Sequence, residues 1–466
     1  MLNSSRIIGL TLTAAIAASV AVVVAAVPTP SAVPAAVAEP RPEGEVGEAA
    51  QQPRITNGKI DQQTVASSLA QSFRALVAGQ GDAGWIGYSV PIVDSERVMC
   101  CFDGDTTFIN GTVVSDGRTC CRACRLEPAA DGTSMSRRAP AAASGAAAGV
   151  VQLERSDRFV VLFRVAAKEV ERIRVFSEDC ALDAGGRTIT WLQNVRPADS
   201  IALLESLATA DRRPDRVADG AITAIALHAD AAADASLDRL VAVNQPESQR
   251  RKVTFWLGNA RGARGLATLK RVLADDPSVE VQKSAVFGVS QSREAAAFDT
   301  LAALATDHAT PRIRSEAVFW IAQKDDGRAA KVVLQALEND PSAEVRKKAV
   351  FALSQLKEGG VDALIRVAKN GPDASTRGEA IFWLGQKAGQ KASAAILERI
   401  DQDPETEVKK KAVFSLSQLP KDEGVPLLIN VARTNKNPEV RKQAMFWLGQ
   451  SRDPRAIEFF SEILKK

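Results

Sequence analysis

The sequence is poor in the side chains that most enzymes use for acid, base and nucleophilic chemistry. It has one tyrosine, Tyr88, and two histidines, His228 and His308, neither with an obvious partner in the sequence. It contains no Gly-rich phosphate-binding loop, no HExxH motif and no GxSxG motif. We therefore expect no catalytic residues, no cofactor and no metal, although an unusual enzyme stays open on these grounds.

The sequence also lacks a strong excess of charge of either sign. Its 59 basic and 56 acidic residues leave a formal net charge of +3. A nucleic-acid-binding protein is expected to gather a clear surplus of Lys and Arg on one face. We therefore expect no nucleic-acid partner.

The amino terminus has the pattern of an export signal. Arg6 precedes an uninterrupted apolar run from Ile7 to Val27, and the small residues Ala36-Val37-Ala38 suit a signal peptidase, with Val24-Ala25-Ala26 as a competing site. We expect residues 1–38 to be a cleaved signal peptide and the protein to be periplasmic or secreted. The alternative is an inner-membrane anchor facing the periplasm, because about 20 apolar residues can span a bilayer. Membrane association is expected only in that case.

All the cysteines fall in one middle stretch of the chain. In an exported protein, disulfides are the default interpretation of such a cluster. The CxxC spacing at 121–124 also suits a redox thiol or a Zn²⁺ thiolate site, but no strand-to-helix thioredoxin pattern surrounds it. A thiol redox or metal-binding protein is therefore the rival hypothesis. The six residues are Cys100, Cys101, Cys120, Cys121, Cys124 and Cys180.

Composition divides the region before the repeats into two parts. Residues 39–56 are rich in Ala, Pro and Glu and are expected to form a disordered linker. Residues 57–210 are expected to form a smaller, cysteine-containing, β-rich α+β domain, with a mobile loop at 128–149 where Ala, Ser and Gly dominate.

Apolar runs predict the elements of this α+β domain. The runs at 159–163 and 170–176 flank a short turn and predict a β-hairpin. Pro197 is typical of a first helical turn and predicts a helix through Leu207. A short helix is expected near 64–77, and weaker strands at 85–93 and 107–114.

A motif of Ala-Val-Phe type recurs from Val253 onward with a period of about 32 residues, which suits one helical hairpin per repeat. Asp or Asn followed by Pro precedes most of these helices and is interpreted as an N-cap. A segment at 221–227 matches in its apolar positions and would be an atypical first repeat. Phe is followed by Trp in alternate repeats, so the duplicated unit contains two repeats. Residues 221–466 are thus expected to form an α-solenoid of about eight repeats.

Through segments such as Glu344-Val-Arg-Lys-Lys-Ala-Val-Phe-Ala-Leu-Ser-Gln, the chain resembles the HEAT-repeat family, especially its bacterial HEAT-like branch related to the phycobilin lyase repeats. The resemblance implies an α-solenoid of helical hairpins. It also implies a protein-binding scaffold, because most members bind proteins, and it leaves a chromophore lyase as a third hypothesis.

A helical wheel separates two kinds of position in each repeat. Val345, Ala349 and Leu353 share one face, and Phe351 lies nearly opposite. In the HEAT-like pattern this position is variable and faces the concave side of the superhelix, yet here it is Phe seven times. These residues could line a groove bordered by lysines, suited to an apolar and acidic peptide, or could pack against the neighbouring repeat. They are Phe255, Phe287, Phe319, Phe351, Phe382, Phe414 and Phe446, with Lys283, Lys347, Lys348, Lys410, Lys411 and Lys442.

Other repeated positions are interpreted as structural. The Trp positions lie beside the apolar stripe and are expected in the inter-repeat core. A recurring Gln near each helix end is expected to form a structural ladder. A recurring Arg or Lys is expected to pair with an acid of a loop or helix. These are Trp256, Trp320, Trp383 and Trp447; Gln291, Gln323, Gln355, Gln386, Gln418 and Gln450; and Arg314, Arg346, Arg377, Lys409 and Arg441.

Together these patterns predict an exported, non-enzymatic scaffold. The expected partner is an unknown protein or peptide bound by the concave face of the solenoid.

Overall fold

The computed structural model describes residues 53–65, 68–95, 97, 119–121, 124–127, 150–152, 156–178, 180–210, 215–324, 326–387 and 390–465. The predicted signal segment, the cysteines Cys100 and Cys101, the predicted strand at 107–114 and the predicted loop at 128–149 all lie outside these residues. Within them, no helix is both long and apolar enough to cross a membrane.

One mixed β-sheet forms the first part of the described chain. Its strand order is β1-β8-β2-β6-β7, and β4 also pairs with β8. β8 runs parallel to β1, β2 and β4, whereas β6 is antiparallel to both β2 and β7. A separate short pair joins β3 to β5. The strands are β1 (Ile55–Thr64), β2 (Gly84–Pro91), β3 (Thr119–Cys121), β4 (Cys124–Arg125), β5 (Val150–Gln152), β6 (Arg158–Ala166), β7 (Glu169–Ser177) and β8 (Leu182–Gln193).

The predicted hairpin is confirmed as β6 and β7. Ala167 and Lys168 form the turn with φ of 50° and 63°, the left-handed conformation that two-residue hairpin turns require. β6 is buried on both faces from Phe159 to Phe163, which explains its continuous apolar run.

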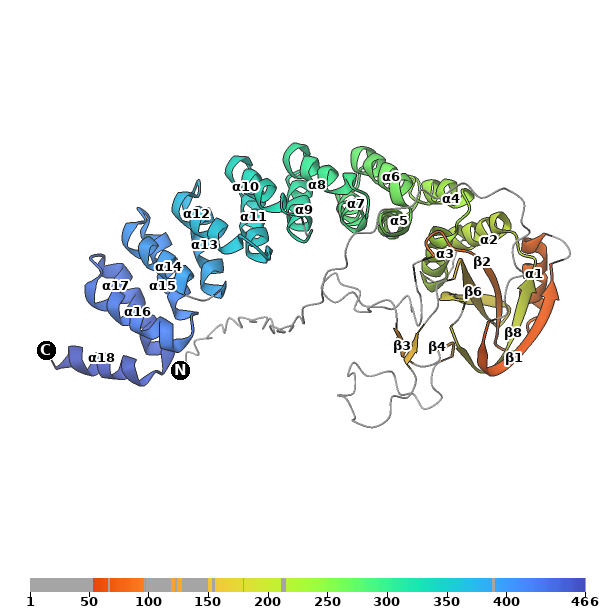
Figure 1. The fold of residues 1–466 in the computed structure, drawn as a ribbon, viewed down its shortest axis with the longest axis horizontal. Coiled ribbons are helices and arrows are strands. Elements are labelled where there is room, and N and C mark those ends of the chain that lie inside the picture. The colour runs from red at the N-terminus through yellow and green to blue at the C-terminus, as the bar shows by residue number, and fades with distance from the viewer. Residues whose placement is uncertain are drawn as a thin grey trace, which may run out of the picture. The chain divides into compact units, whose positions relative to one another are not determined.

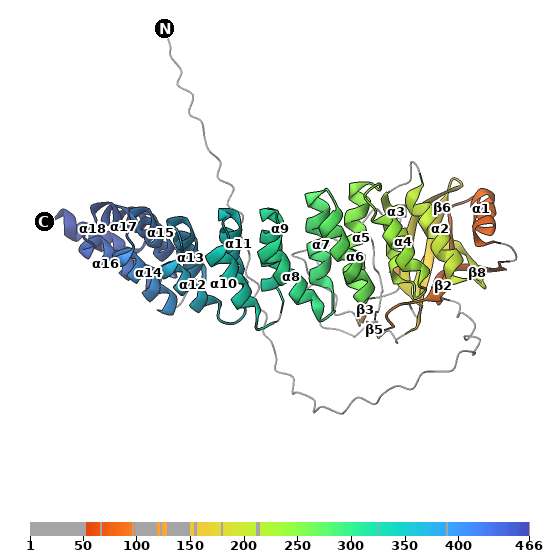
Figure 2. The ribbon, with the colours of Figure 1, turned by 90° about the horizontal axis from the view of Figure 1, so that it is seen from above.

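Helices cover one face of the sheet and tie it to the repeats. Figure 2 shows α1 (Leu69–Gly79), α2 (Pro197–Thr209) and α3 (Asp215–Leu227) beside the strands. These helices share one apolar core with the inward residues of β2, β6 and β7. A second core on the opposite face contains Trp85 and Trp191. The first core continues without a break into the following helices. Apolar side chains therefore pack across the domain boundary that was expected between residues 210 and 221.

Two predicted boundaries differ from the structure. The sheet begins at Ile55, inside the stretch predicted as linker, because the polar sequence of β1 pairs in parallel with β8. The helix predicted at 64–77 begins at Leu69 instead, where the Ser68 side chain accepts a hydrogen bond from the Gln71 N–H as an N-cap.

From Asp215 to Leu464, the described residues form eight successive helical pairs. In Figure 1 the odd-numbered helices α5 to α13 form one row and the even-numbered helices α6 to α12 form another. The predicted α-solenoid after an α+β domain is thus confirmed. The remaining helices are α4 (Ala232–Leu240), α5 (Glu247–Ala260), α6 (Gly262–Asp275), α7 (Val279–Gln291), α8 (Ala296–Asp307), α9 (Pro311–Ala322), α10 (Ala329–Asn339), α11 (Ala343–Gln355), α12 (Gly360–Asn370), α13 (Ala374–Lys387), α14 (Gln390–Gln402), α15 (Thr406–Ser417), α16 (Lys421–Thr434), α17 (Pro438–Ser451) and α18 (Pro454–Leu464).

Buried Arg–Asp pairs join successive repeats. Arg314 donates to the Asp340 carboxylate at 2.6 and 3.0 Å, 26 residues further along the chain. Arg377 makes the same contact with Asp403, and Arg250, which the sequence analysis missed, makes it with Asp276. Burial opposes ionisation of Asp340, but its hydrogen bonds from Arg314 and the Ser342 N–H hold its pKa below the ordinary value.

These aspartates correct one sequence interpretation. Asp276, Asp340 and Asp403 are not N-caps; each accepts a hydrogen bond from the backbone N–H two residues later and so shapes the turn before the helix. Asn437 is the exception: its side chain caps α17 as predicted. The predicted pairing of the repeated arginines is confirmed for Arg314, Arg346 and Arg377.

A second correction concerns His228, which has partners far away in the sequence. Its Nε2 lies 2.9 Å from Ser200 Oγ, which in turn lies 2.8 Å from the hydroxyl of Tyr88. All three side chains are fully buried, where no substrate can reach them. The network joins β2, α2 and the end of α3, so it fastens the sheet to the first repeat. Burial lowers the pKa of His228 to about 4, against the hydrogen bond to the Ala224 carbonyl, which raises it.

We expect Asp340→Ala to destabilise the repeat array by about 3 kcal/mol, because it leaves Arg314 buried without its partner and removes the hydrogen bond to Ser342. The matched control is Asp299→Ala at the exposed pair with Arg328, which should cost less than about 1 kcal/mol. Urea unfolding followed by circular dichroism measures both changes. Equal losses for the two variants would contradict the stabilising contribution of the buried Arg–Asp pair.

We expect the unfolding free energy to fall as pH falls from about 6.5 to about 4, because in this window the unfolded chain binds a proton that folded His228 does not. The loss attributable to His228 is about 3 kcal/mol. Urea unfolding at pH 7 and pH 4 compares the parent with His228→Gln, which has no titrating ring. The account fails if both proteins lose the same stability.

Candidate binding surface

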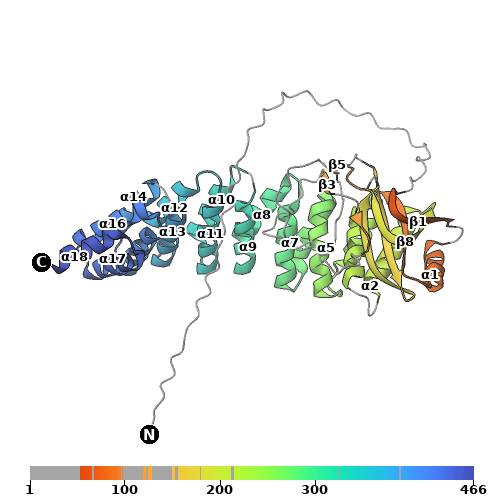
Figure 3. The same cartoon turned by 90° about the horizontal axis from the view of Figure 1, so that it is seen from below.

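The seven predicted phenylalanines lie on seven odd-numbered helices, from α5 to α17. The wheel analysis is confirmed: Val345, Ala349 and Leu353 of α11 are fully buried, whereas Phe351 is only half-buried. Figure 3 shows α5, α7, α9 and α11 side by side, so equivalent positions follow one another from helix to helix.

The phenylalanine rings stack in pairs. Phe255 stacks on Phe287 with ring centroids 5.9 Å apart, and Phe319 stacks on Phe351 at 6.0 Å with planes 6° apart. Phe382 and Phe414 form the third pair at 6.4 Å and 5°. Each pair belongs to one two-repeat unit, which agrees with the longer period in the sequence.

Tryptophans connect one stacked pair to the next. Trp320 lies 4.7 Å from Phe287 of the preceding unit and 4.9 Å edge-on to its own neighbour Phe319. Trp383 and Trp447 repeat this arrangement, each 5.0 Å from the phenylalanine before it. The rings therefore form one unbroken series from Trp256 to Phe446, which we call the aromatic row. The tryptophans make the predicted inter-repeat contacts, although Trp320, Trp383 and Trp447 are half-buried rather than buried.

Small residues bring the helices of each stacked pair together. A Cβ atom added at Gly258 of α5 would lie 1.8 Å from the carbonyl oxygen of Gly288 in α7. A Cβ atom added at Gly385 of α13 would lie 2.9 Å from the Cβ of Ser415 in α15. Ala322 and Ala352 occupy the same two positions in α9 and α11. This close backbone approach sets the distance over which the rings stack.

The geometry combines the two predicted interpretations of the phenylalanines. Each ring packs against a neighbouring repeat, yet six of the seven are half-buried and Phe446 is 53% exposed. Such ring pairs contribute about 1 kcal/mol each beyond their buried area, so neighbouring rings hold one another in place. The exposed part of the row is consequently a rigid apolar strip.

The bordering lysines are less available to a partner than the sequence suggests. Lys283, Lys347 and Lys410 form ion pairs with Glu280, Glu379 and Glu407 respectively. Lys348 lies over two aromatic rings, with its Nζ atom 5.1 Å from the centre of Phe319 and 5.8 Å from that of Phe351. Lys411 and Lys442 form no ion pair with any residue that the structure describes. The basic character is therefore concentrated toward α15 and α17.

The recurring glutamines also differ from the prediction. Gln355 and Gln418 are exposed, and each donates to the serine immediately before it instead of to an adjacent repeat. The serines Ser354 and Ser417 in turn donate to the Phe351 and Phe414 carbonyls.

Of the six cysteines, the structure describes the side chain of Cys180 alone. Cys180 is buried in the second core of the sheet. Cys120, Cys121 and Cys124 lie on β3 and β4, and the structure describes only their backbone. Among the residues whose side chains are described, neither a disulfide nor a group of three metal-binding side chains is found.

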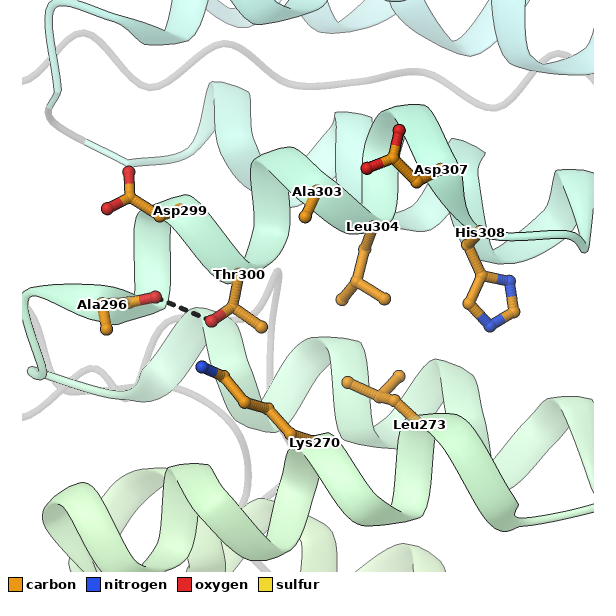
Figure 4. A pocket seen from close by; sticks show the side chains of 9 residues that line it. All are labelled: Lys270, Leu273, Ala296, Asp299, Thr300, Ala303, Leu304, Asp307 and His308. Carbon is orange, nitrogen blue, oxygen red and sulfur yellow. Dashed lines mark hydrogen bonds between the residues drawn. The ribbon is translucent and has the colours of Figure 1, made fainter.

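A second surface, missed by the sequence analysis, lies on the other row of helices. A groove of about 500 Å³ separates α6 from α8, and Leu273 and Leu304 approach each other across it (Figure 4). Lys270 lies at one end and His308 at the other. The groove stays open because Ala296 and Ala303 of α8 have small side chains. The alanine-rich sequence of this outer helix is the signal from which the groove could have been predicted.

Comparison with known proteins identifies the repeats. Residues 298–385 and 393–466 match the family described as HEAT repeats. No curated protein matches the chain significantly.

Several solved structures are similar to part of this chain at low identity. A structure of YibA from Escherichia coli is 22% identical, covers 50% of this chain and 86% of its own, and has a TM-score of 0.32. Human deoxyhypusine hydroxylase in complex with glycerol is 16% identical, covers 55% of this chain and 96% of its own, and has a TM-score of 0.24. Kap95p bound to RanGDP is 14% identical, covers 54% of this chain and 39% of its own, and has a TM-score of 0.33. The repeat assignment rests on the family match and the helical pairs.

We expect Gly258→Ala to destabilise the protein by about 2 kcal/mol, because the new methyl group would collide with the backbone of α7. Gly449 holds the equivalent position in α17 but has no heavy atom within 4 Å of an added Cβ. Gly449→Ala should therefore stabilise by about 0.5–1 kcal/mol through helix propensity alone. Thermal unfolding of both variants tests this, and the same sign for both changes would refute the close-approach argument.

Proposed function

We propose that this protein, whose carboxy-terminal region consists of HEAT repeats, is a non-enzymatic scaffold that binds a protein or peptide along the aromatic row. The observation that carries the proposal is the unbroken series of rings from Phe255 to Phe446, which are half-buried except for the exposed Phe446. An exposed apolar strip of this length is uncommon on a surface that contacts only water.

Rigid aromatic side chains suit this task. Aromatic residues lose little conformational entropy when they bind, and they dominate the energy of many protein interfaces. Here the stacking holds each ring before any partner arrives.

The lysine pairing refines the expected partner. Because Lys283, Lys347 and Lys410 are already neutralised by glutamates, contact along most of the row is apolar. Acidic residues of a partner would be favoured toward Lys411 and Lys442. We therefore propose an apolar polypeptide segment with acidic residues at the end that reaches α15 and α17.

The proposal includes the cellular setting. The amino-terminal apolar run supports export to the periplasm or outside the cell, and the clustered cysteines support disulfides in the β-rich domain. A free-thiol count on the protein from the envelope fraction, with and without reductant, tests the disulfides.

The test places a photo-crosslinking amino acid at Gln355, which is exposed at the end of α11 beside the aromatic row. The matched control is Gln335, exposed on α10 in the other row of helices. We expect a protein adduct at position 355 and none at 335. Adding Phe351→Ser and Phe414→Ser should reduce the adduct at least about tenfold while helical content is unchanged.

Two results would refute the proposal. One is an adduct of equal yield at both positions. The other is an adduct at position 355 that persists at full yield after the two phenylalanine substitutions.

A further inference from the structure

The two edges of the sheet differ in what lies beside them. At one edge α3 lies against β7, and a Cβ atom added at Gly220 of α3 would come within 2.3 Å of the Ile173 carbonyl oxygen. At the other edge β1 is the last strand, and its outer side pairs with no strand that the structure describes (Figure 1). Eight of the ten residues of β1 are exposed. Proteins usually cover or shorten a strand edge of this length, because it readily pairs with another strand.

The main chain of β1 presents alternate residues to this open edge. The Val65 N–H donates to the Gln193 carbonyl of β8 at 3.2 Å, and the pairing with β8 is regular from Lys59 to Thr64. Successive residues of a strand direct their N–H and C=O groups to opposite sides. The odd-numbered residues from Lys59 onward therefore face β8, and the even-numbered residues, among them Ile60 and Thr64, face the open edge.

Two opposite charges flank the centre of β1. Lys59 and Asp61 are both exposed, and neither forms an ion pair with any residue that the structure describes. They are two residues apart, so they lie on one face of the strand, and Ile60 lies on the other face, where it packs against the second core. Thr56 and Thr64 stand four residues to either side of Ile60. The sequence of the strand is therefore complementary to itself about Ile60.

We infer that β1 is a dimerisation edge, which pairs antiparallel with β1 of a second copy about a two-fold axis through Ile60. In this register the even-numbered residues form the hydrogen-bonded pairs, in agreement with the direction of their main-chain groups. Each Lys59 lies opposite Asp61 of the second copy, in a non-hydrogen-bonded pair, where the side chains are closest. Thr56 of each copy lies opposite Thr64 of the other.

The charges select this register over its neighbours. A shift by one residue would bring main-chain groups that already face β8 to the contact. A shift by two residues places either Lys59 opposite Lys59 or Asp61 opposite Asp61. Like charges in directly opposed positions destabilise a strand pair, whereas opposite charges stabilise it. A strand of unrelated sequence would meet the same main-chain groups, but the matched charges indicate a second copy.

The contact is short and reversible. Register shifts between β1 and β8 lie before Lys59, and such irregularities twist a strand locally. Lys59, Ile60 and Asp61 are therefore the centre of the contact, and its two Lys–Asp pairs supply much of its specificity. Dimerisation should accordingly depend on protein concentration and weaken at high salt, because salt screens exposed charges.

The dimer carries two aromatic rows, because β1 and the helices of the row have no residue in common. A partner with two binding segments would be held by both rows, which raises its apparent affinity. This consequence rests on the proposed function, whereas the dimer itself does not.

Sedimentation velocity of the full chain at increasing concentration tests the inference. Lys59→Asp and Asp61→Lys should each weaken dimerisation at least about tenfold, because each places like charges opposite each other twice in the dimer. The double variant with Lys59→Asp and Asp61→Lys restores the opposite pairs and should dimerise like the parent. Lys168→Asp, at an exposed lysine in the turn between β6 and β7, is the control and should leave the dimer unchanged.

Cross-linking determines the register. A carbodiimide joins a lysine to a carboxylate that it contacts, so a mixture of isotopically light and heavy protein should yield a cross-link between Lys59 of one copy and Asp61 of the other. The inference is overturned by a parent that stays monomeric, by single variants that dimerise like the parent, or by a double variant that does not recover. Dimers without the mixed cross-link would also overturn it. None of these outcomes bears on the aromatic row, so the two proposals fail independently.

Discussion

The contact between successive Phe-bearing helices governs the rest of the array. Small residues such as Gly258 and Gly288 allow two helix backbones to approach closely, and that approach sets the rings above them into stacks. At the other end of the helices, buried pairs such as Arg314 with Asp340 fix the turns. Helix spacing and ring geometry thus follow from the close helix contact, and the turn conformation follows from the buried Arg–Asp pairs.

This contact also explains why a structural feature can serve as a binding surface. A ring that stacks on its neighbours cannot turn inward to escape water, so part of it stays exposed along every repeat. The same aromatic side chains therefore stabilise the array by stacking and form the exposed strip. The sheet is joined to this array through the buried hydrogen bonds of Tyr88, Ser200 and His228, and it continues the same core.

The features that sequence analysis predicted are those that depend on local patterns. The period of 32 residues identified the repeats, and the apolar runs around Ala167 and Lys168 identified the hairpin, because both signals lie within a short stretch of chain. The missed features join distant residues. The polar strand β1 pairs with β8 more than 120 residues away. The sequence around Asp340 suggests an N-cap, and only the structure shows that its carboxylate accepts hydrogen bonds from Arg314. A wheel gives the angle of Phe351 on its helix but not the ring that stacks on it.

The most direct test of the central claim is hydrogen exchange of the full protein with and without the partner captured at position 355. The account predicts added protection in the carboxy-terminal halves of α9, α11, α13 and α15, which carry the aromatic row, and none in α10 and α12. Protection confined to α10 and α12, or to the groove between α6 and α8, would contradict it and would assign binding to the other row of helices.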